Sequence, residues 1–141
     1  MARRRVRLKE EGVEAVSLGQ ALEKPPAWLK TALAQVNPRE DDAVLALNTA
    51  LMTGGVALRI GDGVTLDKPI HVIQLDGKGE PASTVTRNVV VAEPGSSATL
   101  LESFGSLGVR GLQRNAVTEV RVGAKLDEPG GKVERVSPLP L

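Results

Sequence analysis

The chain has 141 residues, of which 41% are hydrophobic and 25% are charged, so we expect at most one globular domain. It carries 18 basic and 17 acidic residues, and a net charge of +1 gives no electrostatic case for a dedicated nucleic-acid binder. With no cysteine, these residues cannot provide a disulfide, a thiolate nucleophile or a thiolate ligand for a metal or an iron–sulfur cluster. Trp28 and Phe104 are the only aromatic residues, which predicts a core of small aliphatic side chains.

Residues 1–16 are expected to form a basic N-terminal arm. Arg3, Arg4, Arg5 and Arg7 are not followed by an apolar stretch, which excludes a secretory signal. Apolar runs such as 43–47 are far shorter than the roughly 20 residues of a membrane span. We therefore expect neither a secretory signal nor a membrane-spanning segment. The arm could bind an acidic partner, including nucleic acid, but a solvated terminus is favoured.

Residues 17–55 have a helical pattern. Ser17 and Gln20 have the spacing of a capping box, and Pro25-Pro26 separates this short helix from the next one. In the second helix apolar residues recur with helical spacing, at Leu29, Ala32, Leu33 and Val36.

A third helix is predicted to begin at Asn37-Pro38, with asparagine as the cap and proline in the first turn. Val44, Leu47 and Leu51 align on one face, which we interpret as the side turned towards the core. Gly54-Gly55 is expected to end this helix.

From residue 56 the hydrophobic period changes to two, which is typical of strands. The predicted strands are 56–60, 64–66, 70–75, 85–92, 98–101 and 116–122. Short strands separated by turns, with no helices between them, predict a mainly β body over residues 56–127. Residues 128–141 are interpreted as a Pro/Gly-rich tail.

Two weak internal repeats refine this prediction. The segment Arg87–Val91 recurs 27 residues later as Arg114–Thr118, and Leu66–Pro69 has an echo in Leu126–Pro129. Repeats of about 20 to 50 residues are typical of solenoids, including parallel β-helices. A partial β-helix is therefore favoured over a β-sandwich.

His71 is the only histidine, so any Ser–His–Asp arrangement would have to use it. It alternates in phase with Ile73 and Leu75, which places it on an apolar face of its strand. We interpret it as a partly buried, hydrogen-bonded structural residue rather than a general base.

The remaining polar motifs carry little chemistry. Asp41-Asp42 and Glu10-Glu11 are interpreted as helix-terminus charges and solvated surface, because adjacent side chains point apart. Gly61-Asp62-Gly63 and Gly77-Lys78-Gly79 lack the spacing of known phosphate-binding loops. No catalytic, cofactor-binding or metal-binding residue is assigned, and no cofactor is expected.

From Pro25 to about Asp127 the sequence resembles the SufB/SufD family of iron–sulfur cluster assembly proteins, and within it the SufD members. The resemblance rests on five stretches in order: Asn37–Arg39, Leu45–Leu51 leading to Gly54-Gly55, Leu66–His71, Arg87–Val91 and Asn115–Glu119. It implies a right-handed parallel β-helix preceded by a short α-helical N-terminal region. It assigns no function to His71.

The resemblance further implies a non-catalytic scaffold subunit that works with a SufB-like subunit and a SufC-like ABC ATPase in the cytoplasm. Family members are several times longer, so the sequence predicts a truncated form whose binding to these partners is doubtful, because the ATPase-docking region has no counterpart. The alternative is a small β-helix enzyme or sugar-binding module unrelated to iron–sulfur assembly. That alternative needs carboxylates clustered on one face, which the strand phases do not supply.

Overall fold

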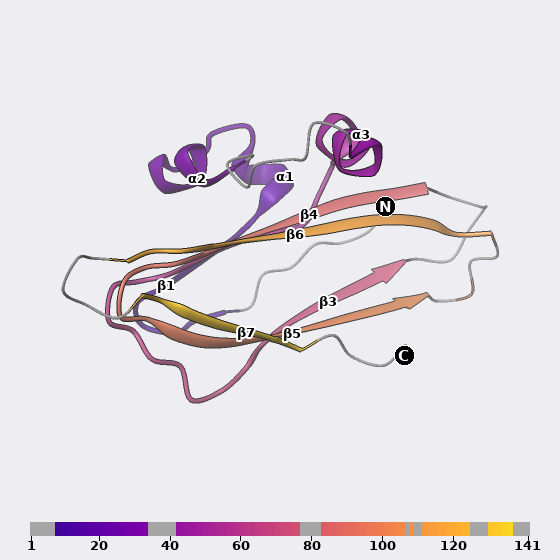
Figure 1. Cartoon of the computed structure of the whole chain (residues 1–141). Coiled ribbons are helices and arrows are strands. Elements are labelled where there is room, and N and C mark those ends of the chain that lie inside the picture. The colour runs from indigo at the N-terminus through magenta and orange to yellow at the C-terminus, as the bar shows by residue number, and fades with distance from the viewer. Residues whose placement is uncertain are drawn as a thin grey trace.

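A computed structural model describes residues 8–33, 42–76, 83–106, 108, 111–124 and 130–136. Two β-sheets lie one above the other, and the helices cover the outer face of one of them (Figure 1). The helices are α1 (Leu18–Ala21), α2 (Ala27–Ala32) and α3 (Ala43–Leu51). The strands are β1 (Val13–Ser17), β2 (Val56–Ile60), β3 (Ile70–Asp76), β4 (Ser83–Ala92), β5 (Ser97–Ser106), β6 (Gln113–Val122) and β7 (Lys132–Val136).

The helix starts agree only in part with the predicted caps. Helix α1 begins directly after Ser17, but the Ser17 side chain makes no capping bond, so the capping box is wrong. Pro26 is the residue before α2. Helix α3 is capped by Asp42, whose Oδ1 accepts a hydrogen bond of 2.9 Å from the Leu45 amide. The predicted start of that helix at Asn37-Pro38 lies outside the described residues.

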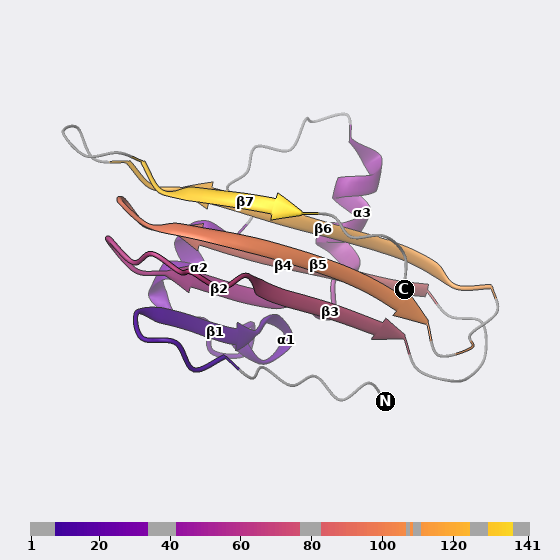
Figure 2. The ribbon, with the colours of Figure 1, turned by 90° about the horizontal axis from the view of Figure 1, so that it is seen from below.

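The mainly β architecture with parallel strands is confirmed. One sheet has the order β1-β2-β4-β6 and the other β3-β5-β7. All pairs are parallel except β1 with β2. From β2 onwards successive strands alternate between the sheets, as Figure 2 lets the reader follow. Neither sheet curls or closes on itself, so the right-handed β-helix stays a prediction.

Two of the described strands, β1 and β7, lie where the sequence predicts none. Strand β1 lies at the end of the predicted basic arm, and β7 lies in the predicted tail. Both have only five residues, so their alternation is too short to recognise, and three of the five residues of β7 are charged. Conversely, residues 64–66 form no strand, and Thr65 makes only an isolated bridge to Ser97.

The strand register corrects the internal repeat. Arg87 lies beside Val117 and Asn88 beside Thr118, so paired residues are 30 positions apart, not 27. The two Arg-Asn dipeptides are therefore not structurally equivalent, because pairing follows the burial of side chains rather than residue identity. The second echo ends at Leu126–Pro129, outside the described residues.

Two apolar clusters hold the layers together. One lies between the sheets and includes Leu58, Val90 and Leu100. The other lies between the outer face of the four-stranded sheet and helices α1 and α2, which contribute Leu18 and Leu29. The buried members of both clusters are aliphatic, as the scarcity of aromatic residues predicted, and Trp28 packs against the helix-covered cluster.

Candidate functional site

A polar cluster lies on the helix-covered face of the four-stranded sheet, beneath α3. Arg87 of β4 and Glu119 of β6 form an ion pair in which the side chains are 2% and 4% exposed. Arg87 Nη1 also donates to Thr49 Oγ1 of α3 at 2.7 Å. The other carboxylate oxygen, Glu119 Oε2, is buried without a hydrogen-bond partner. The cluster joins one helix to two strands.

Asn48 extends this cluster along α3. Its Nδ2 donates to the Thr86 carbonyl and to Asn115 Oδ1, each at 2.9 Å. Asn115 Nδ2 in turn donates to the Val44 carbonyl at 3.1 Å. The predicted core face of α3 is wrong: Val44, Leu47 and Leu51 are 65%, 49% and 52% exposed, and Asn48 is the buried residue. The sequence contained the signal, an asparagine inside an apolar helix, but its spacing alone does not name a partner.

A second polar group lies between the two sheets. Glu102 Oε1 accepts hydrogen bonds from Asn88 Nδ2 at 2.9 Å and from Thr118 Oγ1 at 2.6 Å. Asn88 Oδ1 accepts from the Val56 amide at 3.1 Å. Because these bonds connect β2, β4, β5 and β6, they bind the two sheets to each other in one register.

His71 lies on the outer face of β3, in phase with Ile73 and Leu75 as predicted. It is exposed rather than partly buried, because this face of the sheet is not covered by another described element. The predicted hydrogen bond is present: His71 Nε2 lies 2.8 Å from Ser103 Oγ of β5. Ser103 is buried, so its hydroxyl is poorly placed to attack a substrate.

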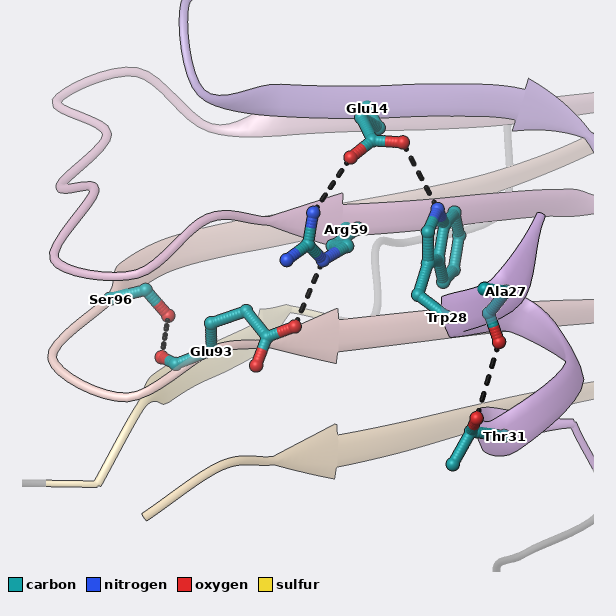
Figure 3. A network of polar contacts seen from close by, with 7 residues as sticks. All are labelled: Glu14, Ala27, Trp28, Thr31, Arg59, Glu93 and Ser96. Carbon is teal, nitrogen blue, oxygen red and sulfur yellow. Dashed lines mark hydrogen bonds and ion pairs between the residues drawn. The ribbon is translucent and has the colours of Figure 1, made fainter. Parts of the chain in front are cut away.

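A third network connects β1, α2 and β2 on the helix-covered face (Figure 3). Arg59 donates to Glu14 at 2.8 Å and to Glu93 at 2.9 Å, and Trp28 Nε1 donates to the other Glu14 oxygen at 3.0 Å. The hydrogen bond to Glu93, followed by that to Glu14, raises the pKa of Arg59 above its usual value. The guanidinium is therefore a permanent cation shared by two carboxylates.

At the far ends of the strands, Arg114 of β6 pairs with Asp76 of β3 and lies 5.1 Å from the centre of the Phe104 ring. These contacts tie the two sheets together at the edge where β3 ends. Like the hydrogen bonds of Glu102, they hold the two sheets together.

A surface pocket of about 260 Å³ lies where the chain enters β3. Its lining comes from two stretches, Leu8 and Glu10 on one side and Thr65–Ile70 on the other. Among the residues that the structure describes, no group of three or more potential ligands is placed to hold a metal ion. No described helix is long and apolar enough to cross a membrane.

The remaining sequence candidates are dispersed. Glu10 and Glu11 are exposed beside a turn, and Asp42 is a helix cap, as the helix-terminus interpretation predicted. Gly61–Gly63 forms a turn without a phosphate-binding arrangement of residues. The arginines of the basic arm, Asp41 and Gly77–Gly79 lie outside the described residues.

The comparisons with known proteins concern the first half of the chain most directly. The family described as SufBD protein N-terminal region matches residues 2–72. An iron–sulfur cluster assembly SufBD family protein of Synechocystis sp. is 29% identical over 96 residues. That alignment covers 68% of this chain and 20% of the relative, so the chain spans about a fifth of the length of the relative. Because the family match extends over half of its residues, this chain belongs to the SufBD family, through the N-terminal region.

Proposed function

We propose that this chain is a non-catalytic, SufD-like scaffold component of iron–sulfur cluster assembly. The observation that carries the proposal is the family match over residues 2–72. The relative whose name includes iron–sulfur cluster assembly supports it. Since the chain has no cysteine, it would contribute surfaces rather than thiolate ligands, and the cluster would be bound by a partner.

The proposed architecture is the start of a right-handed parallel β-helix. Two features support it: strands from β2 onwards alternate between the two sheets, and each pairs in parallel with the strand two positions later. Aliphatic side chains fill the space between the sheets, as stacked solenoid turns require. The proposed partners are a SufB-like subunit and a SufC-like ABC ATPase, in the cytoplasm.

A hybrid protein tests this function. The N-terminal region of the Synechocystis relative is exchanged for residues 2–72 of this chain, and the hybrid is co-expressed with SufB-like and SufC-like subunits. We expect co-purification and cluster formation equal to those of the unmodified relative. The relative with the region deleted is the control. A folded hybrid that behaves like the deletion would contradict the proposal.

The alternative, a small β-helix enzyme, has one observation in its favour, the contact of His71 with Ser103. A Ser–His pair is the beginning of a nucleophile and base arrangement. Hydrolysis of activated esters by the intact chain is compared with that of His71→Ala and Ser103→Ala. We expect background rates in all three; saturable hydrolysis lost in both variants would favour the enzyme.

A further inference from the structure

Helix α3 is attached to the sheet in a different way from its neighbours. Helices α1 and α2 contribute buried aliphatic side chains to the apolar cluster, including Leu18 and Leu29, which are both fully buried. None of the nine residues of α3, all of them described, belongs to either apolar cluster. The buried residue of α3 is a polar one, Asn48.

Polar groups of α3 form hydrogen bonds with the sheet. Asn48 bonds to Thr86 and Asn115, Thr49 accepts from Arg87, and Asn115 donates to the Val44 carbonyl. Detaching the helix returns these groups to water, which replaces much of what each bond contributes. Apolar contacts receive no such compensation on exposure.

Two buried oxygen atoms without hydrogen-bond partners also weaken the docking of α3. Asn48 Oδ1 and Glu119 Oε2 are both buried without a hydrogen-bond partner. Each loses hydration that detachment would restore. Val44, Leu47 and Leu51 are already 65%, 49% and 52% exposed, so detaching α3 exposes less apolar surface than detaching α1 or α2, whose Leu18 and Leu29 are fully buried.

The segment after α3 is fastened independently of the helix. Met52 packs against the apolar cluster, and the Arg87 amide donates to the Gly54 carbonyl at 2.8 Å. Gly55 has φ of +130°, and a Cβ at that position would lie 1.7 Å from the Arg87 carbonyl oxygen. The chain is therefore anchored immediately beyond the helix, by Met52 and Gly54.

We propose that α3 is a strap that opens on its own, with the two sheets and helices α1 and α2 intact, and so uncovers the Arg87–Glu119 pair. A nine-residue helix is marginal in water, so the opened strap also loses its helical hydrogen bonds. Opening is therefore visible at the α3 amides.

Native-state hydrogen exchange of the intact chain, with residue resolution, tests the proposal. We expect the amides of α3 to exchange at least about 100-fold faster than those at the centre of β4, yet slower than in an unstructured peptide. Asn48→Ala should speed exchange in α3 about tenfold and leave β4 within about twofold. Because alanine is a better helix former than asparagine, faster exchange would report weaker docking rather than a weaker helix.

Leu29→Ala is the matched control, since it removes an apolar contact of α2. It should speed exchange in β4 through global unfolding and leave α3 unchanged, because α3 opens without global unfolding. If α3 and β4 exchange at one rate, or if each substitution affects both equally, α3 belongs to the global cooperative unit and the proposal is wrong. Exchange in α3 at the rate of an unstructured peptide would also overturn it, since the strap would never be docked.

Discussion

The side chains of Arg87 and Glu119 form an ion pair on the helix-covered side of the central strands. They are only 2% and 4% exposed, so each has lost nearly all of its hydration. A buried ion pair of this kind contributes little to the free energy of unfolding relative to apolar residues of similar size. Removing one partner, however, leaves the other as an unpaired buried charge. This residue pair is therefore more sensitive to single than to double substitution.

We expect Glu119→Leu to lower the free energy of unfolding by about 3–5 kcal/mol, because it leaves an unpaired buried guanidinium. The double variant Arg87→Met with Glu119→Leu should recover most of this loss. Urea denaturation of both single variants and the double variant gives the coupling. Additive losses in the double variant would show that the two side chains do not depend on each other.

Gly55 is the glycine whose replacement should be most damaging. It combines φ of +130° with a hypothetical Cβ that overlaps the Arg87 carbonyl, so Gly55→Ala should cost about 3 kcal/mol or more. Gly63→Ala is the control: its φ of +67° is also left-handed, but nothing lies within 4 Å, so only about 1–2 kcal/mol of backbone strain is expected. Equal urea midpoints for the two variants would refute the close approach.

At the scale of elements, α2 and α3 differ in which apolar side chains they bury. Leu29 of α2 is fully buried, whereas Val44 of α3 is 65% exposed. Leu29→Ala should therefore cost about 2–5 kcal/mol. Val44→Ala should change stability by less than about 0.5 kcal/mol.

Trp28, the single tryptophan, reports the unfolding of both variants by its fluorescence, since its indole is hydrogen-bonded to Glu14 in the folded state. Its emission is followed in urea for the two variants and the parent chain. If Val44→Ala proves as costly as Leu29→Ala, the outward orientation of α3 is wrong.

For the whole molecule, the strands at the edges of the sheets determine whether the chain can associate with other copies. Strand β6 pairs with β4 on one side, and no described strand pairs with its other edge. Val122 on this strand is 46% exposed. A ten-residue edge with unpaired backbone groups is a template for pairing with another strand.

We therefore expect concentration-dependent association in sedimentation velocity. Val122→Lys should shift the distribution towards monomer, because a charge on an edge strand disfavours pairing. Val44→Lys, on the exposed face of α3, is the control that should leave the distribution unchanged. A monomer at all concentrations would contradict this expectation.

Periodicity alone predicts the mainly β body, the helical start and five of the seven described strands, β2 to β6. Strand β4 is an example: its run of valines and its alternating polar residues mark both faces. His71 shows that the exposure of a side chain does not follow from its phase along the strand. Its phase with Ile73 and Leu75 was predictable, but whether that face is covered depends on which elements lie above it.

Composition and local spacing are enough to predict the helical and the β segments, the aliphatic character of both cores and the absence of thiolate ligands. That α3 buries Asn48 and leaves Leu47 and Leu51 about half exposed depends on its tertiary contacts. The sheet beneath α3 presents the Thr86 carbonyl, the Asn115 side chain and the buried Arg87–Glu119 pair, and buried polar groups require polar partners. Spacing along one chain carries no information about the surface that the chain will meet.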